Sequence, residues 1–94
     1  MFNKNSRWDR KLPASSGRLN EPISVGVVFD KGPKPVWFKW KGTLHKIEHL
    51  TYRWKDRVGD SMRHYFSVDI GGTIYQIYFS DRELTWYMEE VWVE

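Results

Sequence analysis

Apolar and polar residues alternate along most of the chain, and this alternation predicts β-strands. Ile23, Val25 and Val27 are separated by Ser24 and Gly26, which is the period of two expected of a half-buried strand. The same period recurs in four later segments that are rich in aromatic and β-branched residues, which favour strands. These segments are residues 35–41, 63–70, 73–79 and 84–93.

Short turn sequences separate these segments. Gly71 and Gly72 suit a two-residue hairpin loop, because both positions of such a loop require positive φ. Successive hairpins of this kind form an antiparallel meander, and six strands with one apolar face curl into a small barrel or half-barrel. We therefore expect an all-β fold of about six strands over residues 23–94, in a single domain, because 94 residues cannot build two independent cores.

The segment from Thr43 to Lys55 changes phase and is open to two interpretations. As a strand, it needs a β-bulge near Glu48 and His49 to bring its apolar residues to one face. As a helix, it would align Leu44, Ile47, Leu50 and Trp54 at spacings of three, three and four residues. We favour the strand, because the segment is rich in β-forming residues and no helix cap precedes it.

Residues 84–93 pose a similar choice. Ser80 and Glu83 have the spacing of a capping box, which could begin a terminal helix. The segment nevertheless contains Thr, Trp, Tyr and Val, which favour a strand. In that interpretation, the alternation of apolar and polar residues shifts by one position at Glu89 and Glu90.

The chain contains six Trp, five Tyr and five Phe, which is a high aromatic content for its length. A small β domain needs such large side chains to build a core, but not all of them can lie inside. We expect Trp37, Tyr65 and Tyr78 to lie outside, because they alternate with residues assigned to the interior.

The first 22 residues form a basic leader with a net charge of +3 and no regular apolar period. We expect this leader to be largely disordered or only loosely docked. Trp8 lies between Arg7 and Arg10, a combination that could stack on a base or dock on a partner. The plainer alternative is that Trp8 packs against its own domain.

Charge is also segregated within the predicted β domain. Residues 31–57 carry a net charge of +6, whereas residues 58–94 carry −5. Opposite charges could simply meet across neighbouring strands and cancel. Alternatively, cations interleaved with aromatics on a curved sheet could bind single-stranded or duplex nucleic acid through stacking and phosphate contacts. The residues predicted for this site are Trp37, Lys39, Lys41, Arg53, Lys55 and Arg57, with Arg7, Trp8 and Arg10 from the leader.

A spaced set of aromatic and glycine residues runs across the predicted domain. Residues 35–42 read P-x-x-F-x-W-x-G, and residues 86–91 read W-x-M-x-x-V. This order resembles a family of short uncharacterised bacterial β-rich domains that close with W-x-L-x-x-V. Members often occur beside or fused to translesion-polymerase-like proteins, so the resemblance implies a role in DNA repair. The sequence departs from the family at His45, where an aromatic is usual, and in the short turn between Phe79 and Trp86. The family offers no catalytic residues to transfer.

Several chemistries receive little support from the sequence. With no cysteine, the chain has neither disulfides nor thiolate ligands. His45 and His49 would lie about 13 Å apart on a regular strand, too far to share a metal. We expect neither an enzyme nor a cofactor. Since no transmembrane run or secretory signal is visible, we expect a cytoplasmic protein with no membrane partner.

A protein-interaction module is the alternative function. A small sheet with an open edge and exposed aromatics can bind a peptide strand or associate with itself. The acidic end would contribute to such an interface through Glu83, Glu89, Glu90 and Glu94.

Overall fold

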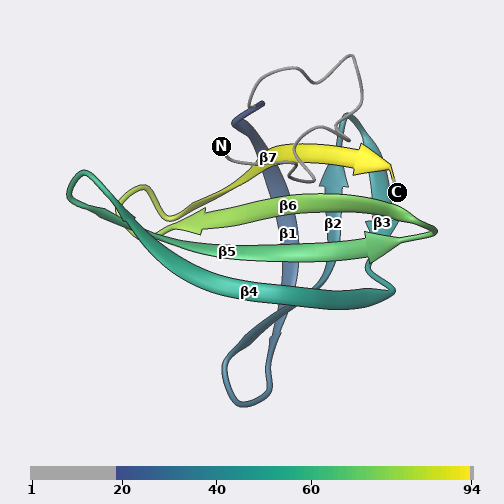
Figure 1. The fold of residues 1–94 in the computed structure, drawn as a ribbon, viewed down its shortest axis with the longest axis horizontal. Helices are drawn as coiled ribbons and strands as arrows, with labels where there is room; N and C mark the ends of the chain where they lie inside the picture. The colour runs from purple at the N-terminus through teal and green to yellow at the C-terminus, as the bar shows by residue number, and fades with distance from the viewer. Residues whose placement is uncertain (1–18, 94) are drawn as a thin grey trace, which may run out of the picture.

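Seven strands form one antiparallel sheet in the computed structural model, which describes residues 19–93 (Figure 1). The order across the sheet is β3-β2-β1-β7-β6-β5-β4. The strands are β1 (Glu21–Phe29), β2 (Pro33–Trp40), β3 (Thr43–Lys46), β4 (His49–Val58), β5 (Ser61–Ile70), β6 (Thr73–Ser80) and β7 (Thr85–Val93).

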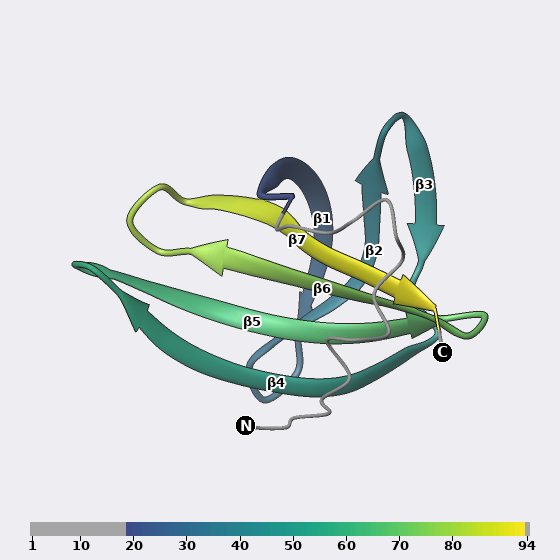
Figure 2. The same cartoon turned by 45° about the horizontal axis from the view of Figure 1, so that its top comes forward.

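The sheet curls into a half-barrel. Strands β1, β2 and β3 run across β4–β7, as Figures 1 and 2 show. We call the side that carries the core the concave face and the opposite side the outer face. The described residues contain no helix, so the predicted all-β half-barrel is confirmed, with seven strands instead of about six.

The additional strand arises because the segment from Thr43 to Lys55 is not continuous. Its first part, β3, pairs with β2, whereas β4 pairs with β5 at the other end of the sheet. The predicted bulge near Glu48 and His49 is therefore wrong, because the chain leaves one edge of the sheet there and enters the other. A register irregularity occurs instead between Leu50 and Tyr52.

This irregularity reverses which residues of β4 face the core. Leu50 packs against the core, whereas Trp54 pairs with Tyr65 on the outer face. One extra residue in a strand moves every following side chain to the opposite face. The expectation that Tyr52 and Trp54 share a face with Leu50 is therefore wrong.

Two-residue turns that contain glycine form two of the hairpins, and the one at Gly71 and Gly72 was predicted. Gly71 and Gly72 have φ values of 59° and 88° and join β5 to β6. Lys41 and Gly42 have φ values of 53° and 77° and join β2 to β3. Such left-handed pairs match the twist of the strands that they connect.

The strand interpretation of the last segment is confirmed by β7. The register between β6 and β7 shifts between Gln76 and Ile77. Gln76 pairs with Glu90, whereas Ile77 pairs with Met88. Glu89 is the extra residue, so the predicted reset of the alternation is also correct. At the other end of the domain, β1 begins at Glu21, two residues before the expected start.

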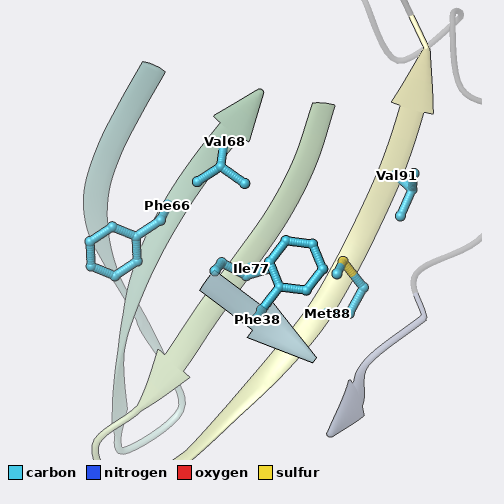
Figure 3. Packing of buried hydrophobic residues seen from close by; sticks show 6 residues of the cluster. All are labelled: Phe38, Phe66, Val68, Ile77, Met88 and Val91. Atoms are coloured by element: carbon cyan, nitrogen blue, oxygen red, sulfur yellow. The ribbon is translucent and has the colours of Figure 1, made fainter. Parts of the chain in front are cut away.

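The core joins the two parts of the half-barrel. Figure 3 shows Phe38 of β2 lying beside Ile77 and Met88 of the main sheet. Direct pairing of β1 with β7 covers only Glu21 to Ile23. Side-chain packing is therefore the principal link between β1–β3 and the rest of the sheet. The cluster consists of Phe38, Phe66, Val68, Ile77, Met88 and Val91.

The outer face of β4–β7 carries a row of aromatic rings. Trp54, Tyr65, Tyr78 and Tyr87 follow one another across the four strands, with neighbouring ring centroids 5.1, 5.3 and 5.2 Å apart. Tyr65 and Tyr78 are only 6% and 3% exposed. They lie on the expected face, but the expectation that they would be exposed is wrong.

Trp37 lies on the outer face of β2 and covers Gly26 of β1. A Cβ atom added at Gly26 would lie 2.1 Å from Cε2 of the Trp37 ring. We expect Gly26→Ala to displace the ring and to lower the free energy of unfolding by about 1–3 kcal/mol, measured by urea denaturation.

A double-mutant cycle provides the control for Gly26. In a Trp37→Ala background the contact is absent, so Gly26→Ala should cost much less. An equal cost in both backgrounds would show that the contact with Trp37 does not explain the need for glycine.

Candidate nucleic-acid interface

The structure divides the predicted nucleic-acid residues between the two faces of the sheet. Phe38 is in the core, so Trp37 and Lys39 on either side of it face outward on β2. Lys41 lies in the following turn, with Nζ 4.9 Å from the centre of the Trp40 ring. The leader residues Arg7, Trp8 and Arg10 lie outside the described part of the chain.

The cations of β4 lie on the concave face instead. Arg53 pairs with Phe66, a core residue, and Lys55 and Arg57 follow on the same side of the strand. The sequence pattern placed them on the polar face, because it did not reveal the irregularity between Leu50 and Tyr52. The β2 and β4 residues therefore do not form one surface.

A groove lies on the concave side, between the β1–β2 turn and strands β4 and β5. It encloses about 460 Å³ and adjoins a second hollow of about 340 Å³, with which it shares Pro33, His64 and Phe66. The first hollow is lined by Lys31, Gly32, Pro33, Arg53, Trp54, Lys55, His64, Tyr65 and Phe66, of which Trp54 and Tyr65 direct their rings to the outer face. The second is lined by Val27, Phe29, Pro33, His64, Phe66, Phe79 and Trp86.

Aromatic rings line much of this groove. The Trp86 ring centroid lies 5.3 Å from that of Phe79 and 5.4 Å from that of Phe66. His64 lies beside Phe79, with ring centroids 6.4 Å apart. Phe29 is 82% exposed, so its ring is accessible to a ligand.

Cations line the same groove. Lys31 lies in the β1–β2 turn, and Lys55 lies across from it on β4. Arg53 Nη1 donates to the carbonyl oxygen of Pro33 at 3.3 Å, which links β4 to this turn. Arg57 continues the basic row along the concave face of β4.

The acidic residues of the basic segment make local contacts with the backbone. Asp56 Oδ1 accepts a hydrogen bond from the Arg57 backbone N–H, and Glu48 Oε1 accepts one from Gly71. Asp56 also pairs with Arg63 across the β4–β5 ladder, on the outer face. The segment thus presents a cationic concave side.

Sequence reasoning did not assign Lys31, Phe29, His64, Phe79 or Trp86 to a site. Phe29 and Phe79 line the second hollow, on the concave side of the sheet. Interior positions near the end of an open half-barrel need not be covered, because no further strand closes over them. The turn sequence after Asp30, with a lysine beside glycine and proline, was the available signal.

Shifted pKa values gather on the outer face and around the core. A hydrogen bond with Tyr65 is the main cause that raises the pKa of Arg63, and burial raises the pKa of Tyr78. Burial likewise raises the pKa of Tyr75, which packs against the core. Near neutral pH, Arg63 is cationic and the two phenols are neutral, as arginine and tyrosine side chains ordinarily are.

The structure of residues 19–93 brings together no group of three or more His, Asp or Glu side chains that could hold a metal. His45 stacks on Phe38, with ring centroids 4.8 Å apart. Within the same residues, no helix has the length and apolarity needed to cross a membrane.

The described residues define a small β half-barrel with a basic groove lined by aromatic side chains. No family model matches the chain, and no curated protein or solved structure is significantly similar to it. The resemblance to the bacterial β-rich family therefore stays a prediction.

Proposed function

We propose that the domain binds single-stranded nucleic acid in the concave groove. The observation that carries this proposal is the coincidence of exposed cations and aromatic rings in one hollow. Lys31, Arg53 and Lys55 lie beside Phe66, with Trp86 in the adjoining part. Cations contact phosphates, whereas aromatic rings stack on bases irrespective of sequence.

A single strand fits this arrangement better than a duplex. Bases in a duplex are stacked on each other, so their faces are not available to protein side chains, whereas those of a single strand can be splayed apart. Phe29 and Trp86 line the hollow from different strands and would contact such unstacked bases. The role in DNA repair implied by the family resemblance belongs to the same proposal.

Binding of a protein partner is the second candidate. Strands β3 and β4 are the edges of the sheet, and edge strands offer unpaired backbone groups to another chain. Leu44 on β3 and Tyr52 on β4 are 55% and 63% exposed. The predicted contribution of Glu89 and Glu90 is wrong, because both are buried. Glu83 is exposed, and Glu94 lies outside the described residues.

Fluorescence anisotropy with labelled single-stranded DNA, single-stranded RNA and duplex DNA tests the proposed function. We expect micromolar binding to single strands. If three phosphates are contacted, affinity should fall about 20-fold between about 50 and 200 mM salt. Binding should also quench tryptophan emission, because Trp86 lies in the groove.

Two results would contradict single-strand binding in the groove. Absence of binding at about 50 mM salt would reject a nucleic-acid function and favour the edge-strand alternative. Equal affinity for duplex DNA, without any change in tryptophan emission, would indicate a purely electrostatic contact elsewhere.

A further inference from the structure

A row of side chains crosses the concave face and changes from cationic to aromatic along its length. Lys55 of β4 pairs with His64 of β5. Phe79 of β6 is the next residue of the row, and Trp86 of β7 is the last. Residues paired across neighbouring strands point to the same face. Lys55 lines the first hollow and Trp86 lines the second, while His64 lines both.

The aromatic end of this row faces a second wall. Phe29 and Pro33 pair with each other at the β1–β2 turn, and both line the second hollow. The turn lies beside β4, where Arg53 donates to the carbonyl oxygen of Pro33 (Figure 1). The hollow of about 340 Å³ therefore lies between this turn and the main sheet, with aromatic rings from both. Such a space suits a flat aromatic group that stacks on these rings.

The lining rings are accessible and already positioned. Phe29 is 82% exposed, and Trp86 is half-buried. The Trp86 ring packs against the rings of Phe66 and Phe79. A ring that its neighbours hold in place loses little conformational freedom when a ligand binds.

Stacking dominates what the second hollow offers to a ligand. Among the described residues that line it, only His64 and Trp86 have a side-chain nitrogen. A pocket of this kind distinguishes bases chiefly by the strength of stacking. The fused rings of a purine present a larger face than the single ring of a pyrimidine, so a purine is the better fit.

The first hollow supplies the charge that a phosphate requires. Lys31 and Lys55 line it from the β1–β2 turn and from β4, and both are exposed. We propose that the second hollow binds the base of one purine nucleotide, while Lys31 and Lys55 bind its phosphate. The assignment rests on the proposed function, because it places the base and the phosphate of the same ligand in two parts of the groove. A free mononucleotide and a nucleotide within a strand share this chemistry.

Titration of the full-length, isotope-labelled chain with small ligands tests the assignment. In NMR spectra, adenosine monophosphate should shift the indole N–H signal of Trp86, identified with Trp86→Phe, more than that of Trp54 on the outer face. It should bind more tightly than uridine monophosphate. It should also bind about 10-fold more tightly than adenosine, which lacks the charge-assisted contact of the phosphate. Ribose phosphate, which has no base, should leave the Trp86 signal in place.

Three results would overturn the assignment. A Trp86 signal that does not move with adenosine monophosphate would reject the base pocket. An equal shift with ribose phosphate would mean that the phosphate alone is bound. Equal affinities for the adenosine and uridine monophosphates would reject the preference for a purine.

Phe29→Ala is a second test that spares the core, because the Phe29 ring is 82% exposed. It should lower the affinity for adenosine monophosphate about fivefold or more, the effect of losing one stacking ring. The matched control, Tyr52→Ala, removes a 63% exposed ring from the outer face of β4 and should leave the affinity unchanged. An unchanged affinity of the Phe29 variant would overturn the placement of the base beside Phe29.

Anisotropy titrations with labelled single strands separate this inference from the proposed function. If strands bind but adenosine monophosphate leaves the Trp86 signal unmoved, the nucleic-acid function stands and the base pocket is wrong. If adenosine monophosphate shifts that signal but strands do not bind, the pocket is a site for a free nucleotide and the single-strand function is wrong.

Discussion

Phe38→Ala is expected to lower the free energy of unfolding by about 3–5 kcal/mol, the range for removing a buried aromatic ring. Phe38 is fully buried, and its ring centroid lies 4.8 Å from that of His45 and 5.1 Å from that of Tyr75. It also links β2 to the main sheet, where backbone pairing between β1 and β7 is short. For a small domain, such a loss lowers the melting temperature by roughly 15–30 °C, measured by circular dichroism.

Leu44→Ala is the matched control for this core substitution. Leu44 lies on the neighbouring strand β3, but it is 55% exposed and faces outward. Its truncation should change the free energy of unfolding by less than about 0.5 kcal/mol. Similar losses from both variants would mean that β2 and β3 do not pack as described.

Lys55→Glu with Arg57→Glu is expected to weaken binding of single-stranded nucleic acid by at least about 100-fold, because two charge-assisted contacts together contribute about 3 kcal/mol or more. Both side chains are exposed on the concave face of β4. Their loss should also reduce the salt slope of the logarithm of the binding constant by about 1.4. Anisotropy titrations at several salt concentrations measure both quantities.

Lys39→Glu with Lys46→Glu makes the same change in net charge on the outer face. Lys39 lies on β2 and Lys46 on β3, and both are exposed. We expect this pair to weaken binding only modestly, through the long-range field. If it abolishes binding while the β4 pair does not, the interface lies on the outer face of β2, as the sequence pattern suggested.

Arg53 is not a suitable test residue, although it lines the groove. Its guanidinium donates to the carbonyl oxygen of Pro33, so its replacement would also release the β1–β2 turn from β4. Replacement of Lys55 and Arg57 tests binding without removing this structural contact.

Local sequence determined the class of fold. The alternation around Phe66 and Ile77 predicted strands, because side chains of a strand point to alternate faces. Gly71 and Gly72 predicted a hairpin, because two successive positive φ values favour glycine. The reset at Glu89 was also visible, since an extra residue shifts the parity of the pattern.

The candidate site was only partly predictable. The basic residues of β4 were identified from charge and spacing, but their face depended on the irregularity between Leu50 and Tyr52. Lys31 and Trp86 were not identified, because residues far apart in the sequence line one groove only once the half-barrel has curled.

Tertiary structure alone decided which polar positions are buried. Tyr78 and Glu90 lie on the face opposite the core, where side chains are usually exposed to solvent, yet they are 3% and 0% exposed. The alternation of apolar and polar residues indicates which face of the sheet a side chain occupies, because successive residues of a strand point to opposite faces. Whether something else covers that face depends on contacts between distant parts of the chain, and a local pattern contains no record of them.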